Sequence, residues 1–134
     1  HGTGHGVGYL SNVLERPNGL RWKVVPERQD SAVIEPGMIC SDEPGLYFAG
    51  DFGTRTENLI LCVEDEKNEY GQFLKFEFLT KAPIDLEALD IRFMDDADIE
   101  RLNTYHKDVY ETISPYMNDE EKEWLKHVTR EISR

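Results

Sequence analysis

The stretch PGMICSDEPGLYFAGDFGTRTENLILCV, residues 36–63, decides the fold because Pro and Gly divide it into short apolar runs. Residues 38–43 form one such run, which Pro44-Gly45 stops. Further on, Gly50-Asp51-Phe52-Gly53 contains residues that are typical of turns, and residues 54–63 form a second apolar-rich run. The stretch therefore predicts a strand, a turn and a strand.

The sequence on both sides of this stretch continues the β pattern. Residues 9–14 and 20–25 are short apolar-rich runs separated by Pro17-Asn18-Gly19, which predicts a hairpin. Residues 64–70 are acidic and are expected to form a solvated loop, whereas residues 73–80 (FLKFEFLT) alternate well enough to predict another strand.

The last forty residues change to a helical period. Asp95 can cap a helix that ends before Ser114-Pro115. Its apolar positions, spaced by three and four residues, are Ile99, Leu102, Tyr105 or His106, Val109 and Ile113. Asn118 and Glu121 form a capping-box pattern for a second helix, whose stripe is Leu125, Val128 and Ile132. We therefore predict an α+β chain in which two helices follow a sheet.

Length and charge exclude several classes of protein. With 134 residues, the chain has room for one modest domain. Its formal net charge of −12 disfavours binding to nucleic acid or to an anionic membrane surface. The longest apolar run, residues 59–63, is far shorter than the roughly 20 residues that a transmembrane helix needs. Cys40 and Cys62 are interpreted as buried thiols of a cytoplasmic protein, with a disulfide between them as the alternative.

The chain opens at His1 without an initiator Met, which suggests a piece of a longer protein.

The first eight residues, HGTGHGVG, place glycine at every second position around His1 and His5. Glycines let a backbone pass close to a ligand or to another chain segment, which a site containing two histidines needs and a packed core strand does not. A phosphate-binding loop is the rival interpretation, but GxGxxG spacing is absent and no helical pattern follows. A histidine that is merely hydrogen-bonded in a turn is a further alternative.

Two carboxylates extend this candidate site. Glu43 ends an apolar run where Pro-Gly is expected to force a turn and to direct side chains into a cleft. Arg55 and Glu57 share a face, at a period of two, with apolar residues that we expect to be buried: Leu59, Leu61 and Val63. A buried carboxylate needs a cation, so Glu57 either pairs with Arg55 or binds a metal. A site of one histidine and two glutamates suits Mn²⁺, Co²⁺ or Zn²⁺ in a catalytic arrangement.

The motifs HGTGHGVG, PGMICSDEPGLY, FGTRTENLILCV and FEFLTKAPID occur in this order in the chain. Together they resemble the C-terminal half of the catalytic domain of Xaa-Pro aminopeptidases, which are pita-bread metallopeptidases. The resemblance continues into the tail, through LNTYHKDVYETISP and EEKEWLKHVTREI. It implies half of a pita-bread fold: a curved, mostly antiparallel sheet over residues 1–90 that carries metal ligands, and a helical extension over residues 91–134 packed on the same domain.

The resemblance also implies the roles of five residues. The family uses two divalent metals, most often Mn²⁺, held by two Asp, one His and two Glu, with a bridging water as nucleophile. By position in the motifs, His5 is the imidazole ligand, Glu43 is a ligand and proton shuttle, and Glu57 bridges both metals. His1 matches a substrate-side histidine, and Arg55 supports the bridging glutamate. The catalytic set is therefore His1, Glu43 and Arg55, and the metal set is His5, Glu43 and Glu57.

Two departures from the family pattern affect activity. The two Asp ligands belong to an earlier strand that this chain does not contain, so we expect the isolated chain to be inactive. Relatives usually have NVHEGP where residues 12–17 read NVLERP. Leu14 therefore replaces a substrate-contacting histidine and Arg16 replaces a glycine.

The implied activity is hydrolysis of the N-terminal Xaa-Pro bond of peptides with proline in second position, by a cytoplasmic homodimer. Two alternatives remain. One is a non-catalytic remnant that dimerises or binds peptides, because the helical tail contributes to a dimer interface in relatives. The other is a sister peptidase of the prolidase kind, which prefers dipeptides. We also expect that a lone half of the domain exposes apolar strand surface and associates with another copy.

Overall fold

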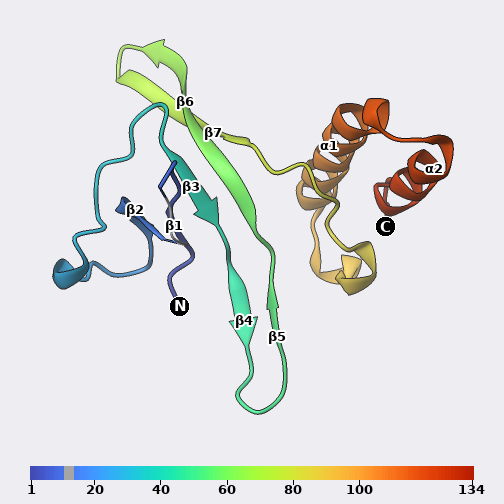
Figure 1. Ribbon diagram of the computed structural model, residues 1–134, viewed down its shortest axis with the longest axis horizontal. Helices are drawn as coiled ribbons and strands as arrows, with labels where there is room; N and C mark the ends of the chain where they lie inside the picture. Colours follow the sequence, from blue (N-terminus) through green and yellow to red (C-terminus); the bar gives the residue numbers. More distant parts are fainter. Residues whose placement is uncertain (11–13) are drawn as a thin grey trace. The chain divides into compact units, whose positions relative to one another are not determined.

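The computed structural model describes residues 1–10 and 14–134 of the chain. It divides into two compact units, His1–Thr80 and Lys81–Arg134, the first built from strands and the second from helices (Figure 1). Among the described residues, no helix combines the length and the apolar character needed to cross a membrane.

The first unit contains a five-stranded sheet and a two-stranded sheet, and every strand pairing is antiparallel, as predicted. The large sheet has the order β2-β1-β3-β6-β7. Its strands are β1 (Gly4–Gly6), β2 (Glu15–Leu20), β3 (Ile39–Asp42), β6 (Asn58–Asn68) and β7 (Gly71–Phe78). The small sheet pairs β4 (Gly45–Tyr47) with β5 (Gly53–Arg55).

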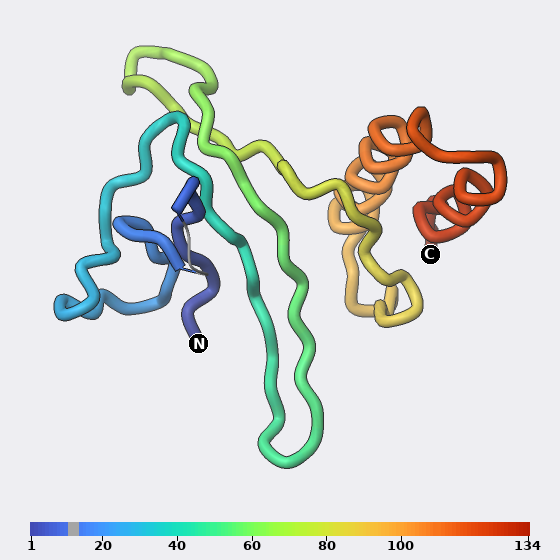
Figure 2. The backbone as a smooth tube through the Cα atoms, viewed as in Figure 1, coloured from blue at the N-terminus to red at the C-terminus, as the bar shows by residue number. Residues whose placement is uncertain are grey.

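The two sheets are successive parts of one long ribbon (Figure 2). Asp42 pairs with Asn58 at the end of the large sheet, and Gly45 pairs with Arg55 at the start of the small one. Two residues on each side lie between these pairs, Glu43-Pro44 on one and Thr56-Glu57 on the other. Pro44 has no N–H to donate to a ladder, so the pairing stops there. The expected turn at Pro44-Gly45 is wrong, because the chain continues into β4 and reverses only at residues 48–52, as predicted for that segment.

Strand β1 lies inside the sheet, between β2 and β3, so the expectation that the alternating glycines do not form a packed strand is wrong. The neighbouring strands approach so closely that a Cβ at Gly4 would overlap the carbonyl oxygen of Ser41. A Cβ at Gly6 would likewise overlap the carbonyl oxygen of Glu15. At Gly4 and Gly6, glycine thus permits the close approach of another chain segment, one of the two uses expected for these glycines.

The predicted hairpin around Pro17-Asn18-Gly19 is also wrong, because these residues lie within β2. Gly19 pairs with His5, and the buried Asn18 amide donates to the sulfur atoms of Met38 and Cys40. These tertiary contacts override the local preference for a turn. Residues 20–25 are not a strand beyond Leu20, and a 3₁₀ turn follows at Pro26–Arg28. Of the predicted strand 9–14, residues 11–13 lie outside the described residues, and the remainder is not strand.

The buried face of β6 is the opposite of the one expected. Ile60 and Cys62 are 5% and 1% exposed, and they lie beside the fully buried Cys40, whereas Leu59, Leu61 and Val63 are only half-buried. Arg55 and Glu57 precede β6 and are exposed. Both thiols are free, as predicted, and burial raises the pKa of the Cys40 thiol.

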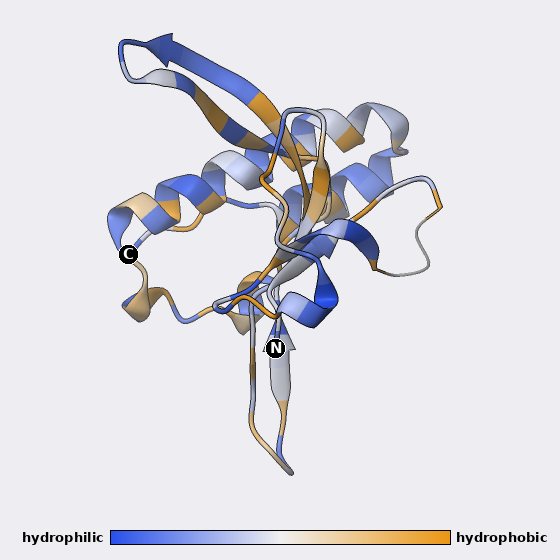
Figure 3. Ribbon diagram, turned by 90° about the vertical axis from the view of Figure 1, so that its left-hand side faces the viewer, coloured by the Kyte–Doolittle hydropathy of each residue, from blue (hydrophilic) through white to orange (hydrophobic). Residues whose placement is uncertain are grey.

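The acidic segment 64–70 is exposed as expected, but most of it is strand, because β6 continues to Asn68. It pairs with β7 in a hairpin whose far end is hydrophilic (Figure 3). The strand predicted over residues 73–80 is confirmed as β7, which ends at Phe78.

The second unit contains α1 (Asp96–Ile113) and α2 (Asp119–Val128), with short 3₁₀ turns at Leu86–Ala88, Ile91–Phe93 and Ser114–Tyr116. The Asp95 cap and the Asn118–Glu121 capping box are confirmed, and Asp95 also forms a capping box with Asp98. The core cluster joins Tyr105, Val109 and Leu125. The helical period is confirmed up to Val128, but Ile132 lies beyond the end of α2.

Candidate metal centre

Three side chains from separate segments converge at the gap in the ribbon. His5 lies on β1, Glu43 follows β3, and Glu57 precedes β6. One ligand atom from each lies within 4.8 Å of the other two. Because Asp42 and Asn58 are the last pair of the large sheet, the residues immediately beyond them, Glu43 and Glu57, leave the ladder side by side. The sheet register therefore brings together the histidine and both glutamates of the predicted metal set.

The His5 ring is held in one tautomer. Its Nδ1 lies 2.8 Å from the carbonyl oxygen of Gly6, and a carbonyl oxygen only accepts, so Nδ1 carries the hydrogen. In the neutral ring the lone pair is then on Nε2, which lies 3.5 Å from Oε1 of Glu43. A neutral imidazole whose second nitrogen is fixed in this way is the form that binds a metal ion.

Glu43 is held from two sides. Ser41, which is fully buried, donates its hydroxyl hydrogen to Glu43 Oε1 over 3.2 Å and accepts the His5 N–H over 3.0 Å. The backbone N–H of Glu43 donates to the carbonyl oxygen of Thr3 over 2.7 Å. Sequence reasoning missed Ser41. The available signal was its position two residues before Glu43, on the same side of an extended chain.

Arg55 contacts the opposite oxygen of the Glu43 carboxylate. Its Nη1 donates to Glu43 Oε2 over 2.7 Å, and its Nε donates to the hydroxyl of Tyr47 over 2.8 Å. The Tyr47 hydrogen bond, followed by the attraction of Glu43 and Glu57, raises the pKa of Arg55. Arg55 thus forms its ion pair with Glu43 and not with Glu57, which was one of the two alternatives for Glu57. Tyr47 is a second residue that sequence reasoning missed.

His1 lies outside the set of possible ligands. It is exposed, and its ring packs edge-on against Tyr47 with the ring centroids 5.0 Å apart. His1 is connected to Glu43 through Tyr47 and Arg55. This position is compatible with a contact to substrate beside the metal centre, which is the role expected for it.

The donor set fits a divalent metal ion. Ligand atoms about 2.1 Å from one ion can be at most about 4.2 Å apart, so the three donors need only a small closing movement. One imidazole nitrogen and carboxylate oxygens suit Mn²⁺, Co²⁺ or Zn²⁺. Three protein ligands leave coordination positions open, as in catalytic rather than structural sites.

Comparisons with known proteins identify a family and similar proteins. Residues 1–64 match the family described as metallopeptidase family M24, and residues 72–132 match the C-terminal region of peptidase M24. A probable Xaa-Pro aminopeptidase P of Coprinopsis cinerea is 34% identical over 98% of the chain. Aminopeptidase P1 of Arabidopsis thaliana is 37% identical over 99% of it. The chain spans about a fifth of the length of these relatives, 22% and 21% respectively.

A solved structure is similar to this chain in fold and in sequence. The X-prolyl aminopeptidase of Caenorhabditis elegans, described as a cytosolic enzyme with a di-nuclear active site, superimposes with a TM-score of 0.82 at 30% identity. The match covers 98% of this chain and 21% of that one.

Proposed function

The chain belongs to metallopeptidase family M24, and we propose from this premise that it supplies part of the active site of an Xaa-Pro aminopeptidase. The single observation that supports the proposal most is the convergence of His5, Glu43 and Glu57 within 4.8 Å. The relatives named above carry the aminopeptidase description, and their similarity covers nearly the whole chain.

We propose that the complete site holds two divalent metal ions, with manganese the first choice. His5 Nε2 and the carboxylates of Glu43 and Glu57 are the ligands from this chain. The C. elegans enzyme is described as di-nuclear, and three donors are few for two ions, so the remaining ligands come from outside this chain. Metal ions in such a site lower the pKa of bound water and stabilise charge that develops on the substrate carbonyl.

The residues of this chain have distinct tasks in the proposed reaction. The Gly6 carbonyl oxygen takes the Nδ1 hydrogen of His5, so in the neutral ring Nε2 carries the lone pair that a metal ion would bind. Glu43 accepts and returns a proton at a carboxylate oxygen, and Ser41 and Arg55 hold that carboxylate in place from its two oxygens. Glu57 lies in the gap between β5 and β6, beside Glu43 and His5, and would hold metal through its carboxylate. His1 contacts the substrate.

The proposed substrates are peptides with proline in second position, cleaved before the proline. A prolidase-like activity is the nearest alternative, and the two are separated by the dependence on peptide length, because a prolidase prefers dipeptides. The C. elegans relative is described as cytosolic, and we propose the cytoplasm for this protein as well.

The direct test uses the longest natural protein that contains this chain. With Mn²⁺ present, it is expected to cleave proline-second peptides, and Glu57→Gln and His5→Ala are expected to lower kcat/KM by at least about a hundredfold. Glu66→Gln, which changes an exposed acid on the same strand as Asn58, is the matched control. Equal turnover by Glu57→Gln and the unchanged protein would contradict the role proposed for Glu57.

The isolated chain is expected to bind metal weakly and to cleave nothing. Calorimetric titration with Mn²⁺ measures the first property, and a peptide assay at the same metal concentration measures the second. Mn²⁺-dependent cleavage by residues 1–134 alone would show that no further ligands are needed.

A second candidate function is a non-catalytic module that assembles with another copy. Phe73, Phe76 and Phe78 on β7 are each close to half exposed, which favours association through this edge strand. Sedimentation of the isolated chain tests for a homodimer. A metal stoichiometry near zero in the longest natural protein would favour this function over catalysis.

A further inference from the structure

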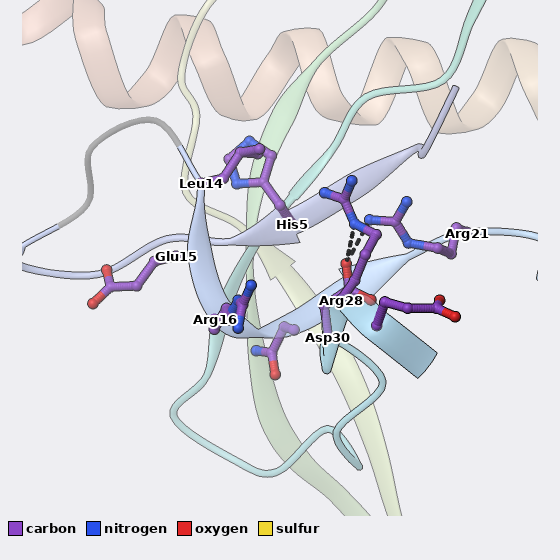
Figure 4. Close-up of a pocket in the computed structure, with 9 residues that line it drawn as sticks. His5, Leu14, Glu15, Arg16, Arg21, Arg28 and Asp30 are labelled. Carbon is purple, nitrogen blue, oxygen red and sulfur yellow. Dashed lines mark hydrogen bonds and ion pairs between the residues drawn. The ribbon is translucent and has the colours of Figure 1, made fainter. Parts of the chain in front are cut away.

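Two features border the candidate metal centre in the first unit. On the side of β2, a cavity of about 360 Å³ opens beside His5 (Figure 4). Its charges balance, because three arginines and three carboxylates line it: Arg16, Arg21, Arg28, Glu15, Glu27 and Asp30. Charge therefore selects no ligand in this cavity. In the other direction, the small sheet of β4 and β5 continues directly from Glu43 and Glu57.

The outer edge of β5 carries unpaired backbone groups. Within the small sheet, the N–H of Phe48 donates to the carbonyl oxygen of Phe52 over 2.8 Å, so that the Phe52 carbonyl faces β4. Successive residues of an antiparallel strand direct their N–H and C=O groups to opposite sides. Those of Gly53 and Arg55 therefore point away from β4. Both residues are exposed, and among the described residues no strand pairs with this edge.

The outer edge of β4 is different, because the N-terminal segment lies beside it. The carbonyl oxygen of Thr3 accepts the N–H of Glu43 over 2.7 Å, and the ring of His1 packs against Tyr47. Gly53, in contrast, has no side chain, and a glycine in a strand allows another backbone to approach closely. Of the two edges, the one on β5 is therefore open to an added strand.

We propose that the part of a substrate peptide that follows the proline pairs with the outer edge of β5 as an added antiparallel strand. The inference rests on the proposed function and adds to it a binding surface for peptide residues beyond the proline. Adding a strand to a sheet edge is a general way to bind an extended peptide, because the backbone groups of the edge gain partners. β5 runs towards Glu57, whereas a peptide whose first residue lies at the metal centre runs away from it, so the two are antiparallel.

The spacing along β5 predicts which peptide residues pair. Arg55 and Gly53 lie two and four residues from Glu57, which is about 7 and about 14 Å along a strand. A peptide whose first carbonyl group lies beside Glu57 therefore places its third and fifth residues beside Arg55 and Gly53. This register also suits the proline, which has no N–H and occupies the second position, where the backbone groups point away from β5.

The test uses the longest natural protein that contains this chain, loaded with Mn²⁺, and four amidated peptides. Ala-Pro-Ala-amide reaches only Arg55, whereas Ala-Pro-Ala-Ala-Ala-amide also reaches Gly53. The pentapeptide is expected to exceed the tripeptide about tenfold in kcat/KM, mainly through a lower KM. The other two peptides are N-methylated forms of the pentapeptide. Methylation of its fifth residue removes a donor to β5 and is expected to abolish the gain. Methylation of its fourth residue, whose N–H points away from β5, is expected to keep it.

Gly53→Pro tests the protein side of the same pairing. Proline removes the outward N–H without removing a bond to β4, so the ratio of pentapeptide to tripeptide in kcat/KM is expected to fall close to one. Gly53→Ala is the matched variant, because an added Cβ meets the Tyr47 ring in both proteins but alanine keeps the N–H. It is expected to keep most of the ratio. Circular dichroism identifies a folding defect in either variant, and the methylated peptides then decide the inference with the unchanged protein.

Equal kcat/KM for the tripeptide and the pentapeptide would overturn the inference. So would equal effects of the two methylations, a loss confined to methylation of the fourth residue, or a ratio that a folded Gly53→Pro variant leaves unaltered. Failure of the proposed function has a different signature, because none of the four peptides is then cleaved by the folded, metal-loaded protein. Calorimetric titration with the same peptides decides the inference in that case, since the same order is expected in affinity. Equal affinity for all four, or no binding of any, would overturn it.

Discussion

The hydroxyl of Ser41 donates a hydrogen bond to Oε1 of Glu43 over 3.2 Å. The same hydroxyl accepts the backbone N–H of His5, so one buried oxygen connects two of the three candidate ligands. Its loss leaves the His5 N–H unpaired and the Glu43 carboxylate held by Arg55 alone, through the other oxygen.

We therefore predict that Ser41→Ala weakens Mn²⁺ binding by about tenfold to a hundredfold, as is typical when a group that orients a metal ligand is removed. Ser41→Thr keeps the hydroxyl and is expected to restore most of the affinity. Calorimetric titration measures both variants, with Thr104→Ala at an exposed helix position as the control. Equal affinities for Ser41→Ala and Ser41→Thr would mean that the hydroxyl does not orient Glu43.

Arg55→Lys is predicted to lower activity, although it keeps the positive charge. The guanidinium group uses Nε for Tyr47 and Nη1 for Glu43 at the same time, whereas a lysine offers one ammonium group that cannot reach both. Because the arginine side chain is 43% exposed, the expected loss is moderate, about tenfold in kcat/KM. Steady-state kinetics of Arg55→Lys beside Tyr47→Phe measure it. Full activity of Arg55→Lys would show that charge alone is sufficient.

Gly4→Ala is predicted to disrupt the close pairing of β1 with β3 beside the candidate metal centre. A Cβ at this position would overlap the Ser41 carbonyl oxygen, which belongs to backbone and cannot rotate away. At Gly2 the nearest atom to an added Cβ, at 3.2 Å, is at the flexible end of Arg21, so Gly2→Ala is the matched control. Thermal unfolding and Mn²⁺ titration are expected to separate the two variants. If Gly4→Ala behaved like Gly2→Ala, the close pairing of β1 with β3 would be wrong.

The buried His106 makes the stability of the second unit dependent on pH. Burial lowers the pKa of His106, and its Nε2 accepts the backbone N–H of Ile84 over 3.0 Å. The unfolded chain, in which the pKa is near 6.5, therefore binds more protons than the folded chain below this pH. The free energy of unfolding is expected to be largest above pH 6.5 and to fall as the pH decreases towards the lowered pKa of the folded state.

His106→Gln keeps a hydrogen-bond acceptor but does not titrate, so its unfolding free energy is expected to change less over this pH range. Urea denaturation at several pH values compares the two proteins, with His127→Gln as a second histidine control. Parallel pH dependences of the unchanged protein and His106→Gln would contradict a buried neutral imidazole.

Leu125→Ala is predicted to destabilise the second unit by about 2–5 kcal/mol. Leu125 is 1% exposed and packs in the cluster with Tyr105 and Val109, so its removal leaves a cavity. Glu120→Ala, at an exposed position of the same helix, is expected to change stability by less than about 0.5 kcal/mol. Chemical denaturation followed by circular dichroism measures both variants.

The sequence was most informative where local rules decide the structure. Asp95 and Asn118 cap their helices because each cap needs only a side chain and an N–H three residues away. The chain reversal at residues 48–52 was also predicted correctly, because glycine and aspartate favour a turn without distant contacts.

The sequence was less informative where contacts with distant residues compete with the local preference of a segment for a turn or a strand. Pro17-Asn18-Gly19 has the composition of a turn, yet Asn18 is held in a strand by Met38 and Cys40, about twenty residues away. The choice of the buried face of β6 depends in the same way on which strands lie beside it. For the site, the motifs pointed to His5, Glu43 and Glu57, but Ser41 and Tyr47 acquire their roles only from their contacts with Glu43 and Arg55.

Glu43 and Glu57 lie at the interruption between the two sheets. Beyond it, β4 and β5 form an arm whose outer end carries Phe48 and Phe52, both more than half exposed. Besides the chain itself, two contacts hold the arm to the large sheet: Arg55 of β5 pairs with Glu43, and Tyr47 of β4 packs against the ring of His1. The arm therefore shares its contacts with two residues of the candidate site, and a substitution at Tyr47 or Arg55 is expected to change the surroundings of both.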